Sequence, residues 1–187
     1  IPGLSDGTLT NSIARMLMHP LKFGPGVAAL AANLLCDIIH NEPTCYTSMN
    51  DAGIVDSYLR FITEGLWPLG PSKTMAKILC AIPTTLNAIC LNENGLQKVL
   101  KLSAFVCFRK MFEDTTFPLN SDTAKVVGTA LNETLRHSPP LQQLGVEILC
   151  GILTHAREQC VEGDARTVAI DHALVTKEVV EQMPKVK

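Results

Sequence analysis

The segment Leu35-Cys36-Asp37-Ile38-Ile39-His40-Asn41-Glu42-Pro43 returns later in the chain as Leu86-Asn87-Ala88-Ile89-Cys90-Leu91-Asn92-Glu93-Asn94. In both copies an apolar stretch with helical periodicity runs into Asn-Glu. A second apolar run follows each copy, at 53–62 and at 104–112. A weaker third copy ends at Leu135-Arg136-His137-Ser138-Pro139. The chain therefore consists of helical units that repeat.

The spacing of the copies, about 45 to 50 residues, lies in the range of armadillo and HEAT arrays. No segment shows the alternating pattern of a β-strand. We therefore predict an all-α, armadillo/HEAT-like helical solenoid of about three repeats over residues 1–160. Residues 161–187 are more polar, and we expect a terminal helix or a partly ordered tail there.

Prolines and glycines divide the periodic stretches. We expect Pro20 to end a first helix at 8–19, and we expect a loop at 65–71, which holds two prolines and two glycines. Pro83 predicts a kink or a break near Ile82. The predicted core stripes are Val27, Leu30, Leu34 and Ile38, flanked by Ala31, Leu35 and Ile39, then Ala124, Val127, Leu131 and Leu135, then Leu141, Leu144, Ile148 and Ile152.

The last of these helices is apolar on more than one side. Leu144, Ile148 and Ile152 form one row, and Val146, Leu149 and Leu153 form the adjoining rows. A helix that is apolar so far around its circumference needs cover on more than one face. We therefore expect an exposed apolar surface at the C-terminal end of the array.

The composition narrows the possible partners. Of the 187 residues, 47% are hydrophobic and 18% are charged, and the net charge is −2. A disordered chain would be more polar, and a nucleic-acid-binding domain would carry a basic face. No apolar run is long enough to span a membrane. We therefore expect protein partners, and neither nucleic acid nor membrane.

The cysteines are odd in number and scattered. There are seven of them, and none forms a Cys-x-x-Cys pair. Most have apolar neighbours, which is typical of reduced, buried thiols. The pattern favours an intracellular protein, cytoplasmic or nuclear.

Two chemical interpretations of the cysteines compete with that one. Cys36, His40 and Cys45 have metal-ligand side chains, but a structural zinc site needs four ligands and no fourth is close in sequence. Cys45 or Cys90 could be a nucleophile, which requires a base and an orienting group in space. Buried thiols in amphipathic helices explain the same residues, so we assign no catalytic, cofactor-binding or metal-binding residue and expect no cofactor.

Other motifs have ordinary structural explanations. The stretch from Gly24 to Ala29 matches a dinucleotide fingerprint in its letters but lacks the preceding strand, so an interhelical turn is favoured. Asn41 and Asn92 recur at matching helix ends and are interpreted as caps or turns rather than peptide-binding groups. Trp67 is interpreted as folding back onto the domain rather than anchoring a partner. The sequon at Asn132 lies in a predicted helix. The residues that bind partners stay unassigned.

Four clusters in one order resemble the N-terminal armadillo-like region of the giant HECT-type E3 ubiquitin ligases. They are Asn41-Glu42-Pro43-Thr44-Cys45, Asp51-Ala52-Gly53-Ile54, the stretch 82–96 from Ile82-Pro83-Thr84 to Glu93-Asn94-Gly95-Leu96, and Leu135-Arg136-His137-Ser138-Pro139-Pro140-Leu141. The resemblance covers most of residues 12–155.

The resemblance implies a non-catalytic scaffold or substrate-recruitment segment of a ubiquitin ligase. Its implied partners are neighbouring repeats of the parent chain and ubiquitination substrates. The family's thioester-forming cysteine lies in a C-terminal HECT domain, so the resemblance carries no catalytic residue onto this chain. The alternative is an armadillo/HEAT protein-interaction scaffold of an unrelated intracellular assembly.

Overall fold

A computed structural model describes residues 7–71, 73–114 and 121–161, and within these ranges all regular elements are helical. This confirms the predicted all-α class. The longer helices are α1 (Thr8–Met18), α3 (Pro25–Asn41), α6 (Lys73–Cys90), α7 (Glu93–Lys101), α9 (Ser121–His137) and α10 (Pro139–Val161). The shorter elements are α2 (Pro20–Phe23), η1 (Pro43–Cys45), α4 (Tyr46–Asp51), α5 (Ile54–Arg60), the π-helical turn η2 (Phe61–Gly65), η3 (Trp67–Leu69) and α8 (Val106–Glu113).

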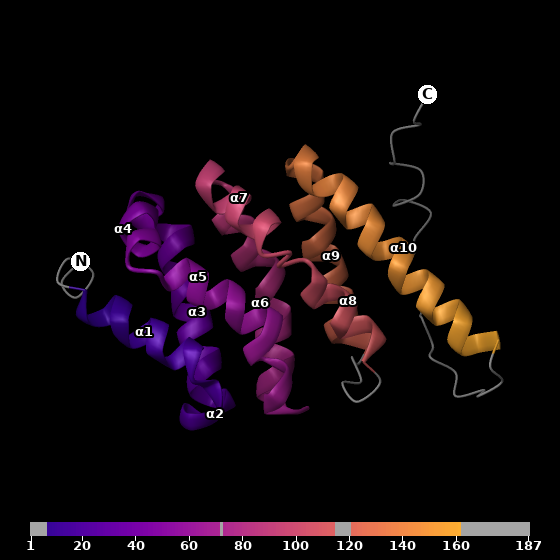
Figure 1. Cartoon of the computed structure of the whole chain (residues 1–187), viewed down its shortest axis with the longest axis horizontal. Helices are drawn as coiled ribbons and strands as arrows, with labels where there is room; N and C mark the ends of the chain where they lie inside the picture. The colour runs from indigo at the N-terminus through magenta and orange to yellow at the C-terminus, as the bar shows by residue number, and fades with distance from the viewer. Residues whose placement is uncertain (1–6, 72, 115–120, 162–187) are drawn as a thin grey trace.

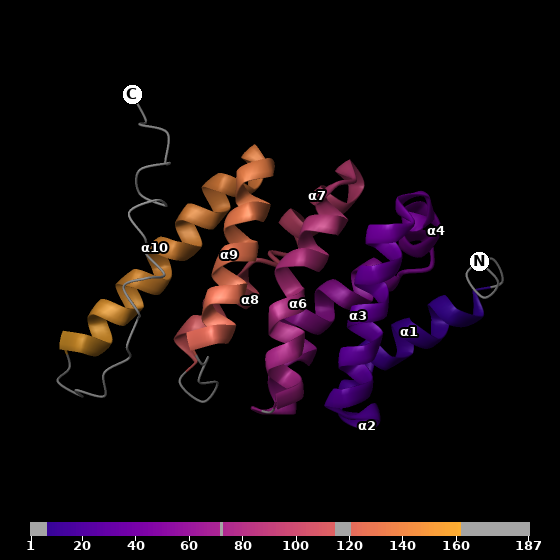
Figure 2. The same ribbon diagram turned by 180° about the vertical axis from the view of Figure 1, so that it is seen from behind.

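The long helices stack side by side along the molecule. The central helix α6 packs against α3 on one side and α9 on the other, as Figures 1 and 2 show from front and back. A second row accompanies them: α1 packs on α3 and α5, α5 contacts α7, and α8 packs on α10. The two copies of the repeat occupy matching places, since the first ends α3 and the second ends α6 and opens α7.

Glycine and proline set most of the helix boundaries. The first helix ends at Met18, one residue before its predicted end, and Pro20 and Pro25 open α2 and α3 at positions where a missing N–H costs least. Gly24, with φ 82°, turns the chain between these two helices, as predicted. Within the expected loop at 65–71 the chain instead ends the π-helical turn and forms η3.

Pro83 does not break α6. The helix runs through it from Lys73 to Cys90, and the proline side chain is buried. An internal proline costs a helix about 3 kcal/mol. Because α6 is covered on both sides by other helices, tertiary packing offsets that cost.

The core only partly follows the predicted stripes. On α3, the predicted Ile38 and the flanking Ala31, Leu35 and Ile39 are buried, whereas Leu30 and Leu34 are 70% and 40% exposed and were wrongly assigned to the core. Ala28, Ala29 and Ala32 complete the buried side, because small side chains allow neighbouring helices to approach closely. Leu135 is only partly buried. On α10 the expected exposed apolar surface is present at Val146 and Leu153.

Two further predictions concern the C-terminal tail and membrane-spanning helices. Residues 162–187, which hold most of the expected tail, lie outside the described residues. Within the described ranges, no helix combines the length and the apolarity that crossing a membrane requires.

Leu86 lies at the centre of the core and is fully buried, at 0% exposure. Leu86→Ala should lower the free energy of unfolding by about 2–5 kcal/mol, because a buried leucine leaves a cavity. Leu91→Ala on the same helix end is the matched control, since Leu91 is 74% exposed and its loss should cost less than about 0.5 kcal/mol. Urea unfolding followed by circular dichroism measures both, and equal losses would contradict the assigned core.

Gly95 marks the closest approach between elements. A β-carbon there would collide with the backbone oxygen of Ile89 and lie 2.6 Å from the Tyr46 hydroxyl oxygen. Gly95→Ala should therefore destabilise the protein by about 1–3 kcal/mol. Gly26→Ala should have the opposite sign, stabilising by up to about 1 kcal/mol, because that helical position has open space. Thermal unfolding of the two variants side by side tests this, and a neutral Gly95→Ala would show that α7 does not depend on the close contact.

Candidate protein-interaction surface

The cysteines lie at different depths in the fold. Cys107 is buried, Cys36, Cys45, Cys80 and Cys90 are half-buried, and Cys150 is exposed, all as free thiols. The expectation of buried thiols therefore fits Cys107 best and was wrong for Cys150. Burial raises the pKa of Cys107, and it raises the pKa of Cys90 to about 12. Such thiols are protonated at neutral pH and are poor nucleophiles.

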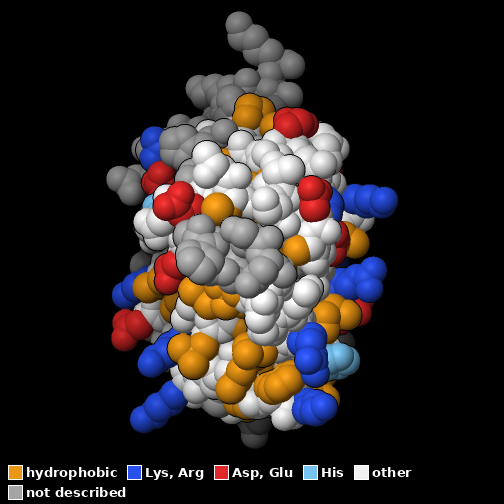
Figure 3. Space-filling view, turned by 90° about the vertical axis from the view of Figure 1, so that its left-hand side faces the viewer, with side chains coloured by type: hydrophobic (Ala, Val, Ile, Leu, Met, Phe, Trp, Pro, Cys, Tyr) orange, Lys and Arg blue, Asp and Glu red, His pale blue; other side chains and the backbone are white. Residues whose placement is uncertain are grey.

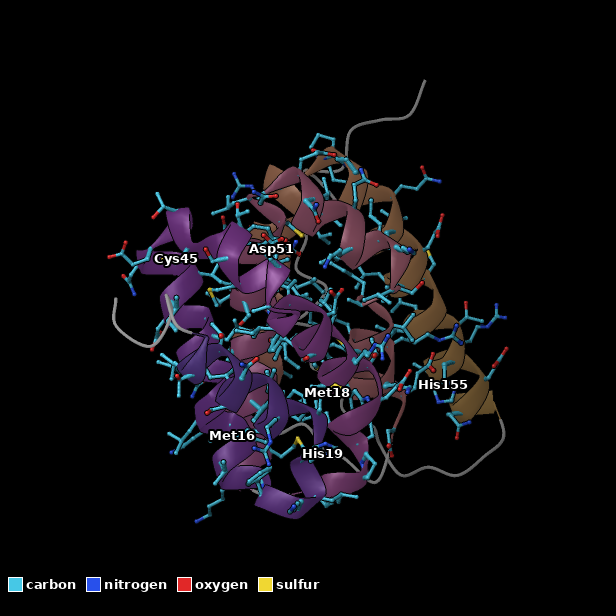
Figure 4. The ribbon with its side chains drawn as sticks, turned by 60° about the vertical axis from the view of Figure 1, so that its left-hand side comes forward. Met16, Met18, His19, Cys45, Asp51 and His155 are labelled. Atoms are coloured by element: carbon cyan, nitrogen blue, oxygen red, sulfur yellow. The ribbon has the colours of Figure 1, made fainter. Side chains whose placement is uncertain are left out.

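The candidate Cys and His residues lie in different surroundings. Burial raises the pKa of Cys36, which a hydrogen bond with Thr85 partly offsets. Its neighbour His40 is exposed on the last turn of α3. Figure 4 shows Cys45 well apart from the labelled histidines, His19 and His155. Across the described ranges, no three His, Cys, Asp or Glu side chains come together as metal ligands.

A shallow hollow lies between α3 and α6. Its walls are Asn33, Cys36 and Asp37 from α3 and Ala81 and Thr84 from α6, around about 320 Å³. These residues come from equivalent long helices of two repeats, so the hollow follows directly from their stacking. Amide, carboxylate and hydroxyl groups on an open helical surface suit hydrogen bonds to another protein chain.

Thr85 lies where three helices meet beneath this hollow. It has no exposed surface, and its hydroxyl donates to the backbone oxygen of Ala81 at 2.9 Å. Its side chain lies beside the Cys36 thiol of α3 and the Tyr58 hydroxyl of α5. Burial is the largest influence on Tyr58 and raises its pKa. A buried polar group is tolerated only when it is hydrogen-bonded, and the bond to Ala81 meets that requirement within α6.

A second open hollow, of about 570 Å³, lies along α7. It is lined by Asn92, Glu93, Asn94, Gln97, Lys98 and Lys101. Asn92 is the N-cap of α7, because its side-chain oxygen accepts a hydrogen bond from the Asn94 N–H at 3.0 Å. Asn41 donates to the backbone oxygen of Asp37 at 2.8 Å. Both asparagines thus bond to their own helix ends, as the capping interpretation predicted.

One ion pair escaped the sequence reasoning. Lys98 Nζ lies 2.6 Å from Asp56 Oδ2 and connects α7 to α5. Nothing local in the sequence pairs Lys98 with a residue 42 positions earlier. The only available signal was the lone carboxylate in the apolar run 53–62.

Trp67 and the sequon at Asn132 have structural roles. The indole Nε1 donates to the backbone oxygens of Ile62 and Thr63, each at 3.1 Å, and Lys110 lies over the ring. The tryptophan therefore folds back onto the domain, as favoured from the sequence. Within the sequon, Thr134 is buried in α9 and donates to the backbone oxygen of Ala130.

This stack of helices belongs to a known class of domain. Residues 1–185 match the family model described as Domain of Unknown Function (DUF913). The chain belongs to the DUF913 family.

The relatives it matches are E3 ubiquitin-protein ligases. It is 33% identical over 153 residues to UPL2 and 32% identical to UPL1, both of Arabidopsis thaliana, with 81% of this chain covered in each case. It is 26% identical over 148 residues to HUWE1 of Mus musculus, which covers 73% of this chain. These matches confirm the resemblance to ubiquitin ligases that the sequence clusters indicated.

The chain matches only a small share of the length of each relative. It spans 4% of the length of the two Arabidopsis proteins and 3% of the mouse protein. No solved structure matches it.

The thiols should react in the order of their exposure. Cys150 should be alkylated by iodoacetamide at pH 7.5 at least about tenfold faster than Cys90 or Cys107, whose raised pKa values leave little thiolate. Site-resolved mass spectrometry measures the rates, with the urea-unfolded chain as the control in which the differences vanish. A hyper-reactive Cys45 or Cys90 in the folded chain would revive the nucleophile hypothesis.

Proposed function

We propose that this chain is a non-catalytic helical-repeat segment of a HECT-type E3 ubiquitin-protein ligase, acting as a scaffold or as a platform for substrate recruitment. The observation that carries the proposal is the match to E3 ubiquitin-protein ligases over about four-fifths of the chain. Its partners are ubiquitination substrates and neighbouring repeats of the parent chain, and its location is intracellular.

The arrangement of the helices supports the armadillo-like part of the proposal. A long helix followed by shorter ones recurs as α3 with α4 and α5, and as α6 with α7 and α8. The long helices are adjacent in space and come from equivalent positions of the repeat. Arrays of this kind bury each unit against its neighbours and leave an extended surface for binding.

The polar hollow between α3 and α6 supports the recruitment part of the proposal. Asn33, Asp37 and Thr84 present side-chain hydrogen-bonding groups around an open depression on the stacked surface. The half-buried Cys36 beneath them lies beside Thr85, and its raised pKa keeps the thiol neutral at physiological pH. This surface suits recognition of a protein chain by hydrogen bonds, with no covalent step.

The proposal predicts no ubiquitin transfer by the isolated chain. An E2 enzyme charged with labelled ubiquitin should pass none of it to this chain, because the family resemblance carries no thioester-forming cysteine onto it and the raised pKa values of Cys36, Cys90 and Cys107 leave little thiolate. Non-reducing gels measure the outcome, and a catalytic HECT domain is the positive control. A reducible ubiquitin adduct on any cysteine would overturn the non-catalytic assignment.

The recruitment role is tested in the parent ligase. Asp37→Lys combined with Thr84→Lys changes the hollow while leaving the buried core intact, since both side chains are exposed. We expect less ubiquitination of substrates that need this segment and unchanged ubiquitin charging of the ligase. Lys73→Asp, on the exposed start of α6, is the matched surface control.

A further inference from the structure

The end of the molecule formed by α1, α2 and α3 exposes large apolar side chains. Met18, Leu21, Leu30 and Leu34 are 44%, 68%, 70% and 40% exposed, and we call these four residues the N-terminal face. Figure 3 looks onto this end, where apolar side chains gather over the lower half and Lys and Arg side chains border them. Large apolar side chains clustered on a surface mark interaction sites more often than single exposed ones do.

Leu30 and Leu34 point away from α6. Cys36, on the same helix, faces α6, where it lines the hollow with Ala81 and Thr84. Each residue of an α-helix turns the chain by about 100°, so Leu34 lies roughly 160° and Leu30 roughly 120° around the helix from Cys36. The two exposed leucines therefore lie on a different side of α3 from the side that Cys36 turns toward α6.

The internal repeat indicates which element contacts the equivalent side of the next long helix, α6. In the alignment that pairs Leu35 with Leu86, Leu30 corresponds to Ala81 and Leu34 corresponds to Thr85. Ala81 lines the hollow against α3, and Thr85 is buried beside Cys36 of α3. In the second copy these two positions therefore receive the preceding long helix. The same two positions on α3 are apolar and uncovered.

The charge around the face indicates the kind of helix that fits it. The exposed ionised side chains around the face are Arg15 on α1 and Lys22 on α2, together with Asp37, which follows Leu34 on α3 by three residues. A helix bearing acidic side chains on the edge that faces α1 and α2 would complement Arg15 and Lys22.

We propose that a helix from elsewhere in the same long polypeptide packs along α3 over Leu30 and Leu34, in the manner in which α3 itself packs along α6. It carries an apolar stripe at helical spacing with acidic residues at its edge. The inference rests on the proposed function in one respect, namely that the chain is part of a much longer protein, as its relatives are.

Cysteine protection tests the proposal. Leu30→Cys is introduced together with Cys150→Ser, both in the 187-residue chain and in the purified full-length polypeptide. We expect alkylation of the new thiol to be at least about tenfold slower in the full-length polypeptide, because an intramolecular helix covers it. Lys101→Cys, exposed on α7, is the control and should react at similar rates in both.

A charge-reversal arm tests the acidic edge. Arg15→Glu with Lys22→Glu in the full-length polypeptide should raise the alkylation rate of the Leu30→Cys thiol at least about twofold, since two attractive surface pairs become repulsive. An unchanged alkylation rate would contradict the proposed acidic residues at the edge of the covering helix.

The remaining outcomes separate this inference from the proposed function. Equal alkylation of the Leu30→Cys thiol in both forms would overturn the inference while leaving the ligase assignment intact. Protection that rises with protein concentration would show that a second copy covers the thiol and would overturn the intramolecular helix. Protection that needs an added protein would overturn it in favour of a separate partner. A ubiquitin adduct on the isolated chain would instead remove the proposed function and leave the packing result standing.

Discussion

The contact between the long helices α3 and α6 is the constraint on which the rest of the fold depends. Alanines line the buried side of α3 at 28, 29, 31 and 32, and all are at most 6% exposed. Helices that meet through small side chains approach closely, and the separation fixes where every later element lies. Because α6 also packs against α9, any shift of α6 relative to α3 also changes the position of α9.

A buried hydroxyl lies within this contact. Thr85 is fully buried where α3, α5 and α6 meet, and it donates to the backbone oxygen of Ala81 on its own helix. A buried hydroxyl that loses its partner costs about 1–3 kcal/mol. Because the partner of Thr85 is on α6 itself, the hydroxyl is tolerated inside the contact, and apolar packing holds the two helices together.

The sequence predicted the helices well and their orientation less well. Pro20, Gly24 and Pro25 act locally, so the boundaries they set were predictable. The exposure of Leu30 and Leu34 on α3 was not, because nearly all positions of that helix are apolar and periodicity cannot choose between adjacent rows. The Lys98–Asp56 pair and the contacts of Thr85 join residues far apart in the chain, and no local pattern encodes such pairs.

The exposed leucines and the small residues at their equivalent positions follow from the same layered construction. In a stacked array, stability is approximately the sum of each unit's own stability and its interfaces with its neighbours. Helix α6 has long-helix neighbours on two sides, whereas α3 meets a long repeat helix on one side only. Burying one leucine contributes about 1.5–3 kcal/mol, so the uncovered Leu30 and Leu34 represent stabilisation that the isolated layers do not realise. The first layer therefore gains stability from any element that covers these two leucines.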